Sequence, residues 1–495
     1  MGFFKSKPDR PTKIPTDTVV PVAYWDQQKH SRAACLHFTY RFEDVLSKDE
    51  LRSSLNRLFD IGNWHRLGAR LRENDNGRLE YHIPAQYDEV RPRFEWTTSD
   101  YPMEINEHPL AERFPKATSH PSIASHPQDI KSLCVGPNCP DRLDDWIYSD
   151  RPQLVIHVSS FNDATLLSVT FMHTLMDAMG IASFLKAWSA VLRGKEDEVP
   201  IFNGIGDYPL ELVNNKTPKE DFIHTNLILR GFSMLLFIIC FVFELIWYSH
   251  EEPRIVCIPG HFVDELHTQA LSELADEKSE ESRFVSESDV LLSWWTKVTI
   301  KALNPSPHRM VTLMNTFDIR SNDLGQPGSN NAFITNAVLA SYTFLRCHDI
   351  LHKPLSYIAS QIRQSLVLQR TERQTQALLA LEKESVLKNG HLPPLGDSTC
   401  ILFAFSNWHK NRLFDIDFAP AVARPGIPPN ERANGLGRPS YVIPLGRFEG
   451  LPLRNMGPVA GKDPSGNWWI MWTLRKQAWS GVEKELDALE WRKIQ

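Results

Sequence analysis

The chain is 495 residues long, of which 42% are apolar, 10% aromatic and 23% charged, a composition that excludes a largely disordered chain. A single domain commonly holds roughly 100–200 residues, so this length predicts at least two packed units. The 54 Lys and Arg stand against 60 Asp and Glu, for a formal charge of -6, and this lack of basic excess argues against a nucleic-acid partner.

The seven cysteines are scattered and include no Cys-x-x-Cys pair, so neither a disulfide scaffold nor a structural zinc site is predicted. Cys347-His348 with His352 has helical spacing, and we interpret it as a face of a surface helix rather than a metal site. The first residues carry no apolar run of a secretory signal, and Gly2 with Ser6 fits only the loose myristoylation pattern. We therefore expect a cytoplasmic protein that holds no metal.

Strands and helices alternate in the first 200 residues. The pattern predicts strands at 35–42, 78–83, 153–158 and 165–171 and helices at 51–61 and 181–192. The second of these helices has Ile181, Phe184 and Trp188 on its apolar face and ends at Gly194. Residues 115–152 are rich in Pro, Ser and Asp, which predicts a long surface loop.

The second half shows the same mixture, and we find no internal repeat of 20–50 residues. It predicts helices at 286–303, 350–388 and 481–491 and strands at 311–319, 400–405 and 468–474. Ser286, with Asp289 three positions later, indicates a capping box at the start of the first helix. We expect a mixed α+β (α/β) protein with an N-terminal domain over 1–215, a crossover that contains an apolar helix over 216–255, and a C-terminal domain over 256–495.

Residues 231–248 form the most apolar segment, broken only by Ser233 and Glu244. Eighteen such residues reach the length of a membrane span, but a span would separate the two halves of the chain and prevent a site that both share. Ser233, Cys240 and Glu244 fall on one stripe at helical spacing, which indicates a helix with a wide apolar face. We expect this face either in the domain interface or, as a peripheral contact, in a membrane surface.

His173 lies where the strand 165–171 opens into a helix, with Asp177 four residues later and small residues around it. A side chain at such a junction can be held rigidly and still project into a cleft, and small neighbours let a substrate approach. A neutral imidazole there can take a proton from an alcohol or an amine. Taken alone, a His-x-x-x-Asp spacing more often marks a buried histidine that its own turn satisfies.

The wider context favours the catalytic interpretation. The order strand, turn, strand, His-x-x-x-Asp and helix, with Trp188-Ser189, resembles the BAHD acyltransferases, coenzyme A-dependent enzymes that acylate alcohols and amines. The resemblance runs along most of the chain and is closest in kind to fungal secondary-metabolite members such as trichothecene acetyltransferases. The further matching segments, in chain order, are the helix 286–303 with its Lys-Ala-Leu end, Phe317–Ser321, Thr335–Leu339, Ser406-Asn407-Trp408 and Asp417-Phe418.

The chain departs from the family pattern in two motifs. Ala178 replaces the commonest Gly after the aspartate, which changes little because both residues are small. The second family motif begins with Asp417-Phe418, but residues 419–421 read Ala-Pro-Ala where the family has Gly-Trp-Gly, which affects local packing more than catalysis. Met172 precedes a single His173, whereas the related condensation domains usually carry two adjacent histidines.

The resemblance implies two chloramphenicol-acetyltransferase-like domains with an active-site tunnel between them. It implies an O-acyltransferase that moves an acyl group, expected to be acetyl, from acyl-CoA to a hydroxyl of a small secondary metabolite, with no bound cofactor. His173 would be the general base. Asp177 would pair with Arg320 to support the catalytic loop, although Asp177 could instead orient the imidazole and Arg320 could bind phosphate. Ser406 and Trp408 would stabilise the oxyanion, or else belong to the core.

Two other functions stay open. One is a non-catalytic, membrane-associated binding protein on a decayed acyltransferase fold, which the altered motif at Asp417 suggests. The other is a stand-alone condensation domain that takes carrier-bound thioesters. For the preferred function we expect acyl-CoA and a hydroxylated small molecule as partners, no nucleic acid, and a monomer.

Overall fold

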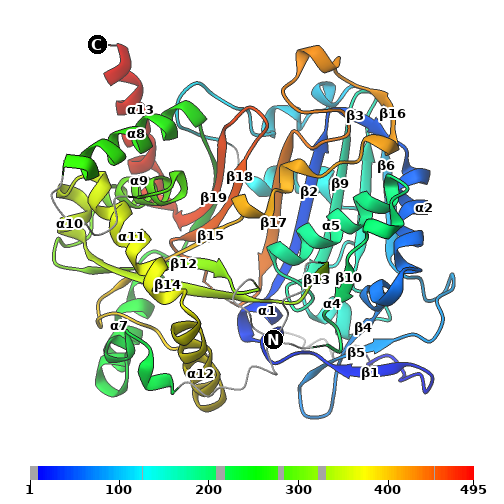
Figure 1. Cartoon of the computed structure of the whole chain (residues 1–495), viewed down its shortest axis with the longest axis horizontal. Coiled ribbons are helices and arrows are strands. Elements are labelled where there is room, and N and C mark those ends of the chain that lie inside the picture. Colours follow the sequence, from blue (N-terminus) through cyan, green and yellow to red (C-terminus); the bar gives the residue numbers. More distant parts are fainter. Residues whose placement is uncertain are drawn as a thin grey trace, which may run out of the picture.

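A computed structural model describes residues 9–124, 126–207, 218–276, 284–320, 330–450 and 452–494, with side chains up to residue 489. Two large β-sheets lie next to each other in the molecule, and helices pack on each of them (Figure 1). The first has five strands in the order β17-β2-β9-β8-β6, and the second has seven in the order β14-β12-β15-β18-β19-β11-β7. The mixed α/β architecture predicted from the sequence is confirmed.

The three central strands of the five-stranded sheet, β2, β9 and β8, are buried along almost their whole length, whereas the edge strand β6 is not. The sheet consists of β2 (Ala34–Phe42), β6 (Glu95–Asp100), β8 (Val155–Ser160), β9 (Thr165–Met172) and β17 (Tyr441–Phe448). All eight residues of β9 are buried, as expected of a strand covered on both faces. Helices α2 (Lys48–Phe59) and α5 (Ala178–Leu192) pack against each other at this sheet, where Trp188 Nε1 donates to Ser54 Oγ at 2.9 Å.

The seven-stranded sheet carries a group of helices on one side (Figure 1). Its strands are β7 (Ser122–Ile123), β11 (Glu251–Ile258), β12 (Met310–Asp318), β14 (Val338–Arg346), β15 (Ile401–Asn407), β18 (Met456–Lys462) and β19 (Trp468–Arg475). The helices are α8 (Gly260–Asp276), α9 (Glu287–Leu303), α11 (Leu355–Gln369) and α13 (Trp479–Ile494). The capping box predicted at Ser286 and Asp289 is present at the start of α9.

The two halves of the chain exchange strands. β17 comes from the last hundred residues and pairs with β2 in the first sheet, and β7 pairs with β11 in the second. Both sheets therefore need both halves of the chain. The domain limits at 215 and 216 lie outside the described residues and stay a prediction.

The remaining elements are short or peripheral. They are β1 (Thr18–Pro21), β3 (Asp44–Leu46), β4 (Arg70–Glu73), β5 (Leu79–Ile83), β10 (Ile201–Asn203), β13 (Asn331–Phe333), β16 (Val422–Pro425), α1 (Lys29–Ala33), α3 (Lys131–Cys134), α4 (Asp144–Ile147), α7 (Gly231–Trp247), α10 (Cys347–His352) and α12 (Glu372–Asn389). The strands and helices predicted for the first half agree within a few residues with β2, β5, β8, β9, α2 and α5.

One prediction from composition was wrong. Residues 115–152 are not a surface loop, because Ile130, Leu133 and Trp146 are buried in the core of the first sheet. The long helical stretch expected over roughly 350–388 is helical for most of its length, but it is divided at Pro354, which cannot continue a helix, and at Thr371, whose side chain caps the start of α12.

The apolar segment forms the helix α7, which lies at the lower left of Figure 1. The prediction that it packs into the domain interface was wrong, since Phe237 is its only buried residue. Among the described helices, none combines the length and the apolar character that crossing a membrane requires.

Candidate active site

His173 stands at the junction of the two sheets, in a turn that both hold. The His173 backbone N–H donates to the Ala34 carbonyl of β2 at 2.9 Å. Asn336, which precedes β14 of the other sheet, donates its side-chain N–H to the His173 carbonyl at 2.9 Å. The Tyr81 hydroxyl donates to the next carbonyl, that of Thr174, at 2.9 Å. The main chain of the predicted catalytic histidine is therefore fixed on both sides.

The His173 imidazole has hydrogen-bonding capacity that is not used. The side chain is half-buried, and its Nδ1 is buried with no hydrogen bond of acceptable geometry. Burial lowers the pKa of His173 from its ordinary 6.5, and its own backbone, the Asp177 carboxylate and the Asn336 side chain offset this shift only in part. The ring is consequently neutral near pH 7 and able to accept a proton.

Asp177 points into its own helix and the second sheet. As the N-cap of α5, it accepts the Gly180 N–H at 2.8 Å. It also accepts Arg320 Nη2 at 2.8 Å and the Ala337 N–H at 3.0 Å. Three donors thus occupy this carboxylate, and none of them is the His173 ring. Of the two arrangements left open above, the geometry shows the ion pair.

Arg320 completes a buried connection between the halves. Besides Asp177, it donates to Asp318 at 2.7 Å and to the carbonyls of Phe333 and Thr335 at 3.0 and 2.7 Å. A guanidinium with so many internal partners has little left for a phosphate group. Ser321, which follows it in the matched motif, lies outside the described residues.

Gly180 explains one of the small residues after His173. A Cβ at this position would lie 2.2 Å from the Ile334 carbonyl oxygen. Only glycine therefore lets the first turn of α5 approach the segment that carries the second sheet's part of the site.

Two residues near His173 were missed by the sequence analysis because no recognisable motif contains them. Asp26 is buried and accepts both the backbone and the side-chain N–H of Asn336, at 2.8 and 2.6 Å. Burial raises the pKa of Asp26 to about 8, although the two Asn336 bonds oppose this. Asp26 thus holds the same amide that holds the His173 carbonyl.

The second missed residue is His30 on α1. Its ring lies edge-on to the His173 ring, with the centroids 6.5 Å apart. His30 keeps accessible surface, yet enough protein surrounds it that desolvation, with a contribution from His173, lowers its pKa to about 4. Two neutral imidazoles therefore face each other in space that solvent can reach.

Ser406 and Trp408 are brought together at the end of β15. Trp408 Nε1 donates to Ser406 Oγ at 2.8 Å, and the Trp408 ring packs on Phe38 of β2, with centroids 5.2 Å apart. Phe38 in turn stacks on Phe171, two residues before His173. Both predicted residues are half-buried, and neither forms a hydrogen bond with His173 in the described structure.

Phe418 lies in the core and Asp417 beside it is half-buried, and neither forms a described hydrogen bond with the His173 turn. Asp417 accepts the Ala419 N–H at 3.0 Å, and its carbonyl accepts the Ser189 hydroxyl at 2.6 Å. Phe418 is fully buried, stacked on Phe42 of β2. The altered second motif still packs tightly at this position.

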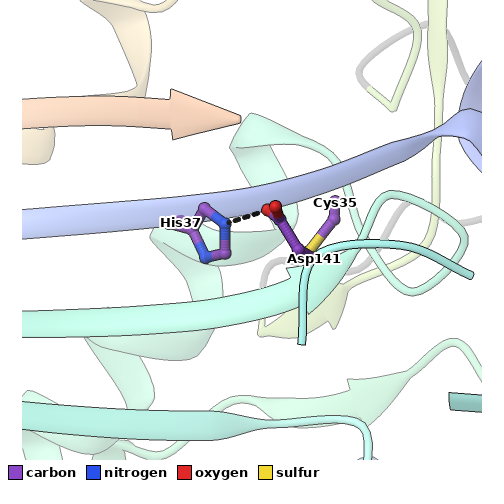
Figure 2. A group of neighbouring side chains, drawn as sticks. All are labelled: Cys35, His37 and Asp141. Atoms are coloured by element: carbon purple, nitrogen blue, oxygen red, sulfur yellow. Dashed lines mark hydrogen bonds and ion pairs between the residues drawn. The ribbon is translucent and has the colours of Figure 1, made fainter. Parts of the chain in front are cut away.

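One group of potential metal ligands occurs in the described residues: Cys35, His37 and Asp141 (Figure 2). The carboxylate of Asp141 accepts Lys131 Nζ at 2.8 Å and Arg447 Nη1 at 3.2 Å, in addition to its bond with His37. Burial raises the pKa of the Cys35 thiol well above its usual range. A protonated thiol and a carboxylate that is already paired with Lys131, Arg447 and His37 do not fit a metal ion. We therefore interpret the group as a polar network.

The chain is similar to known transferases over most of its length. The model of the Transferase family matches residues 140–440. Acetyltransferase adrJ of Penicillium roqueforti is 41% identical, with 99% of each chain covered. O-acyltransferase pboC of Aspergillus ustus is 41% identical over 91% of this chain and 95% of its own. A relative from Penicillium decumbens with the name Transcriptional regulator calD is 38% identical over 98% of both chains.

Solved structures share the fold at lower identity. The structure of F. sporotrichioides TRI101 complexed with Coenzyme A and T-2 has a TM-score of 0.64 and 16% identity, covering 94% of this chain and 97% of its own. The resemblance inferred from the order of the motifs is confirmed. The chain belongs to the Transferase family of BAHD-type enzymes and is an acyltransferase.

Proposed function

We propose that this acyltransferase moves an acyl group, acetyl in the first instance, from acyl-CoA to a hydroxyl group of a small secondary metabolite, with His173 as the general base. The observation that carries the proposal is the neutral, half-buried His173 ring, whose Nδ1 has no hydrogen bond of acceptable geometry while the main chain around it is fixed. The solved neighbour was crystallised with Coenzyme A and T-2, which supports a CoA thioester and a small-molecule acceptor.

The proposed reaction needs no acyl-enzyme. His173 takes the acceptor's hydroxyl proton while the oxygen forms a bond to the thioester carbonyl carbon. When the tetrahedral intermediate collapses, the carbon–sulfur bond breaks and His173 returns the proton to the CoA sulfur. Because Nδ1 is buried, Nε2 is the nitrogen that meets the reactants. Such proton transfer contributes roughly 10²–10⁴-fold to the rate.

The residues around the histidine act on its position. Asp177 and Arg320 pin the first turn of α5 to the second sheet, and Asn336 holds the His173 carbonyl. We assign them to positioning, because Asp177 and Arg320 bond to each other and to the main chain and Asn336 bonds to the His173 carbonyl. The Asn336 amide and the Asp177 carboxylate in addition raise the pKa of the ring. His30 lies beside the ring and forms part of the wall that a substrate would meet.

In the proposed reaction, the Ser406 hydroxyl donates a hydrogen bond to the oxyanion. The Ser406 oxygen accepts the Trp408 N–H at 2.8 Å, so the Ser406 hydroxyl hydrogen is left to donate to another acceptor. A thioester carbonyl that becomes negatively charged is such an acceptor. Trp408 then acts through Ser406, and its ring sets the position by packing on Phe38.

The test is product formation. Purified protein is incubated with acetyl-CoA and pools of hydroxylated terpenoids and polyketides, and products are searched by mass spectrometry for the gain of one acetyl group. We expect transfer by the wild type and by His352→Ala, a control on an exposed histidine of α10, and none by folded His173→Ala. Near-normal transfer by His173→Ala would refute the general-base role.

Two other results would point to the alternatives. Thermal stabilisation by acetyl-CoA without transfer would favour a non-catalytic binding protein. The relative calD has the name of a regulator and not of an enzyme. Transfer that requires a carrier protein instead of free CoA would favour a condensation domain. The monomeric state and the cytoplasmic location stay predictions from the sequence.

A further inference from the structure

Helix α7 exposes its apolar side chains and turns its one charged residue, Glu244, toward the protein. After Gly231, every exposed position of the helix carries a large apolar side chain. These residues are Phe232, Leu235, Ile238, Ile239, Val242, Phe243, Ile246 and Trp247, and we call them the outer face. Their exposed fractions range from 43% to 79%. A contiguous apolar surface of this kind marks an interaction site.

The polar residues of the helix are turned toward the protein. Glu244 accepts Arg309 Nη1 at 2.6 Å and lies 3.7 Å from Arg454 Nη1. Ser233 donates to the Arg230 carbonyl at the start of the helix. Phe237 anchors the inner side in a small core with Leu229 and Cys400, which leaves the outer face without a charge or a hydroxyl.

A groove of about 1040 Å³ runs beside the outer face. Ile239, Phe243 and Trp247 line one side, while Arg309 and Arg454 are among the residues of the other. The lining contains three cationic side chains, Arg309, Arg454 and Arg475, and one carboxylate, Glu244. A second carboxylate, Glu251, pairs with Arg454 from outside the lining. The groove therefore keeps a net positive charge next to an apolar wall.

We propose that α7 lies in the surface of an anionic phospholipid membrane, with the outer face among the acyl chains and the positively charged groove turned toward the anionic headgroups. The proposal does not depend on the identity of the acceptor. An exposed helix satisfies its own backbone groups, so it can enter an apolar phase at this depth. Both ends of α7 are attached to the C-terminal half of the chain. Ile228, just before the helix, bridges Leu395, and β11, just after it, pairs with β19.

Lipid explains the outer face better than a protein partner does. Interfaces between proteins surround an apolar centre with a polar rim, and the outer face has none on the helix itself. Arg230 at one end and Trp247 with Tyr248 at the other are residues that favour the boundary between water and acyl chains. The positive groove adds attraction to anionic headgroups, which decreases with salt.

The test is co-sedimentation of the full-length protein with extruded vesicles. We expect binding to vesicles of phosphatidylcholine with phosphatidylserine, at least tenfold weaker binding to phosphatidylcholine alone, and a decrease with salt. Phe243→Ser with Trp247→Ser should weaken binding at least tenfold. Val367→Ser with Leu368→Ser, two similarly exposed apolar residues of α11, should change it less than twofold. Ile239→Ser with Ile246→Ser provides a second pair on the outer face.

Several results would overturn the proposal. The first is no binding to either vesicle by a folded protein. The second is equal binding to both vesicles, because the negative charge of the lipid would then contribute nothing. Competition by soluble glycerophosphoserine that matches the lipid in potency would also overturn it, because the headgroup would then be recognised without the membrane. The third is a dimer by light scattering in the absence of lipid that Phe243→Ser with Trp247→Ser converts to a monomer, since a second copy would then cover the outer face.

Discussion

Two histidines on neighbouring strands of the first sheet have opposite surroundings. His37 of β2 is buried and bonded at both ring nitrogens, to Thr170 Oγ1 at 2.8 Å and to Asp141 at 3.2 Å. His173, at the end of β9, is half-buried, and its Nδ1 has no partner. Burial lowers the pKa of both rings. The comparison teaches that bonding and access, more than burial, separate a structural histidine from one free to react.

The carboxylates beside these histidines differ in the same way. Asp141 turns toward His37 (Figure 2). Lys131 and Arg447 are further partners of its carboxylate. Asp177 turns away from His173 and joins Arg320. An acid close to a histidine therefore does not establish a catalytic pair, and the contacts of the acid decide which role it has.

The largest effect on stability is expected from Asp177→Ala. This change leaves the Arg320 guanidinium buried without its main charge partner, and breaking a buried pair costs about 3–5 kcal/mol. Urea unfolding at neutral pH measures the loss, and Asp141→Ala, whose carboxylate is about a quarter exposed, is the control with a smaller loss. Normal stability with lost activity would instead mean that Asp177 orients the imidazole.

Ser406→Ala is expected to reduce kcat by roughly 10²–10³-fold if its hydroxyl meets the oxyanion. Trp408→Phe keeps an aromatic ring against Phe38 but removes the bond to Ser406, so its reduction should be smaller. Steady-state kinetics with acetyl-CoA and the acceptor separate kcat from KM. An unchanged kcat in Ser406→Ala would place both residues in the core alone.

His37→Ala should weaken the fold and leave the chemistry. The substitution removes the ring that bonds Thr170 and Asp141, and an unpaired buried polar group costs about 1–3 kcal/mol. We expect a lower urea midpoint with kcat/KM within a few-fold of wild type, in contrast to His173→Ala. A selective loss of kcat in stable His37→Ala would abolish the distinction between the two histidines.

Asp26→Asn is expected to preserve the local hydrogen bonds and to change the pH dependence of stability, because an amide oxygen can accept the same two bonds from Asn336. The pKa of Asp26 is raised from 3.8 to about 8, so the folded state keeps its proton where the unfolded state has lost it. Asp26 therefore lowers stability as pH rises through that window. The variant should lose this dependence, measured as urea midpoints of both proteins at each end of the window. Identical pH profiles would show that Asp26 is ionised in the fold.

Several features could be read from local sequence. The alternating and continuous apolar runs defined β2, β8, β9 and α5 within a few residues, and the capping box defined the start of α9. The position of His173 at a strand–helix junction follows from the same local pattern. Pro354 and Thr371 were also local signals, and they divide the long helical stretch predicted over roughly 350–388 into separate helices.

Other features depend on contacts between distant segments. Asp177 meets Arg320 across 143 residues, and Asn336 meets Asp26 across 310. No periodicity reveals that His30 lies beside His173, that β17 joins the first sheet, or that the apolar side of α7 faces outward.

The sequence by itself determined most of the elements and the family, and it placed His173 at a strand–helix junction, because hydrophobic period, capping and motif order act over a few residues. Only the tertiary structure decided which carboxylate serves which histidine and which side of an apolar helix is covered. The physical reason is that burial and pairing are properties of the neighbours that a side chain acquires on folding, and those neighbours here come from both halves of the chain.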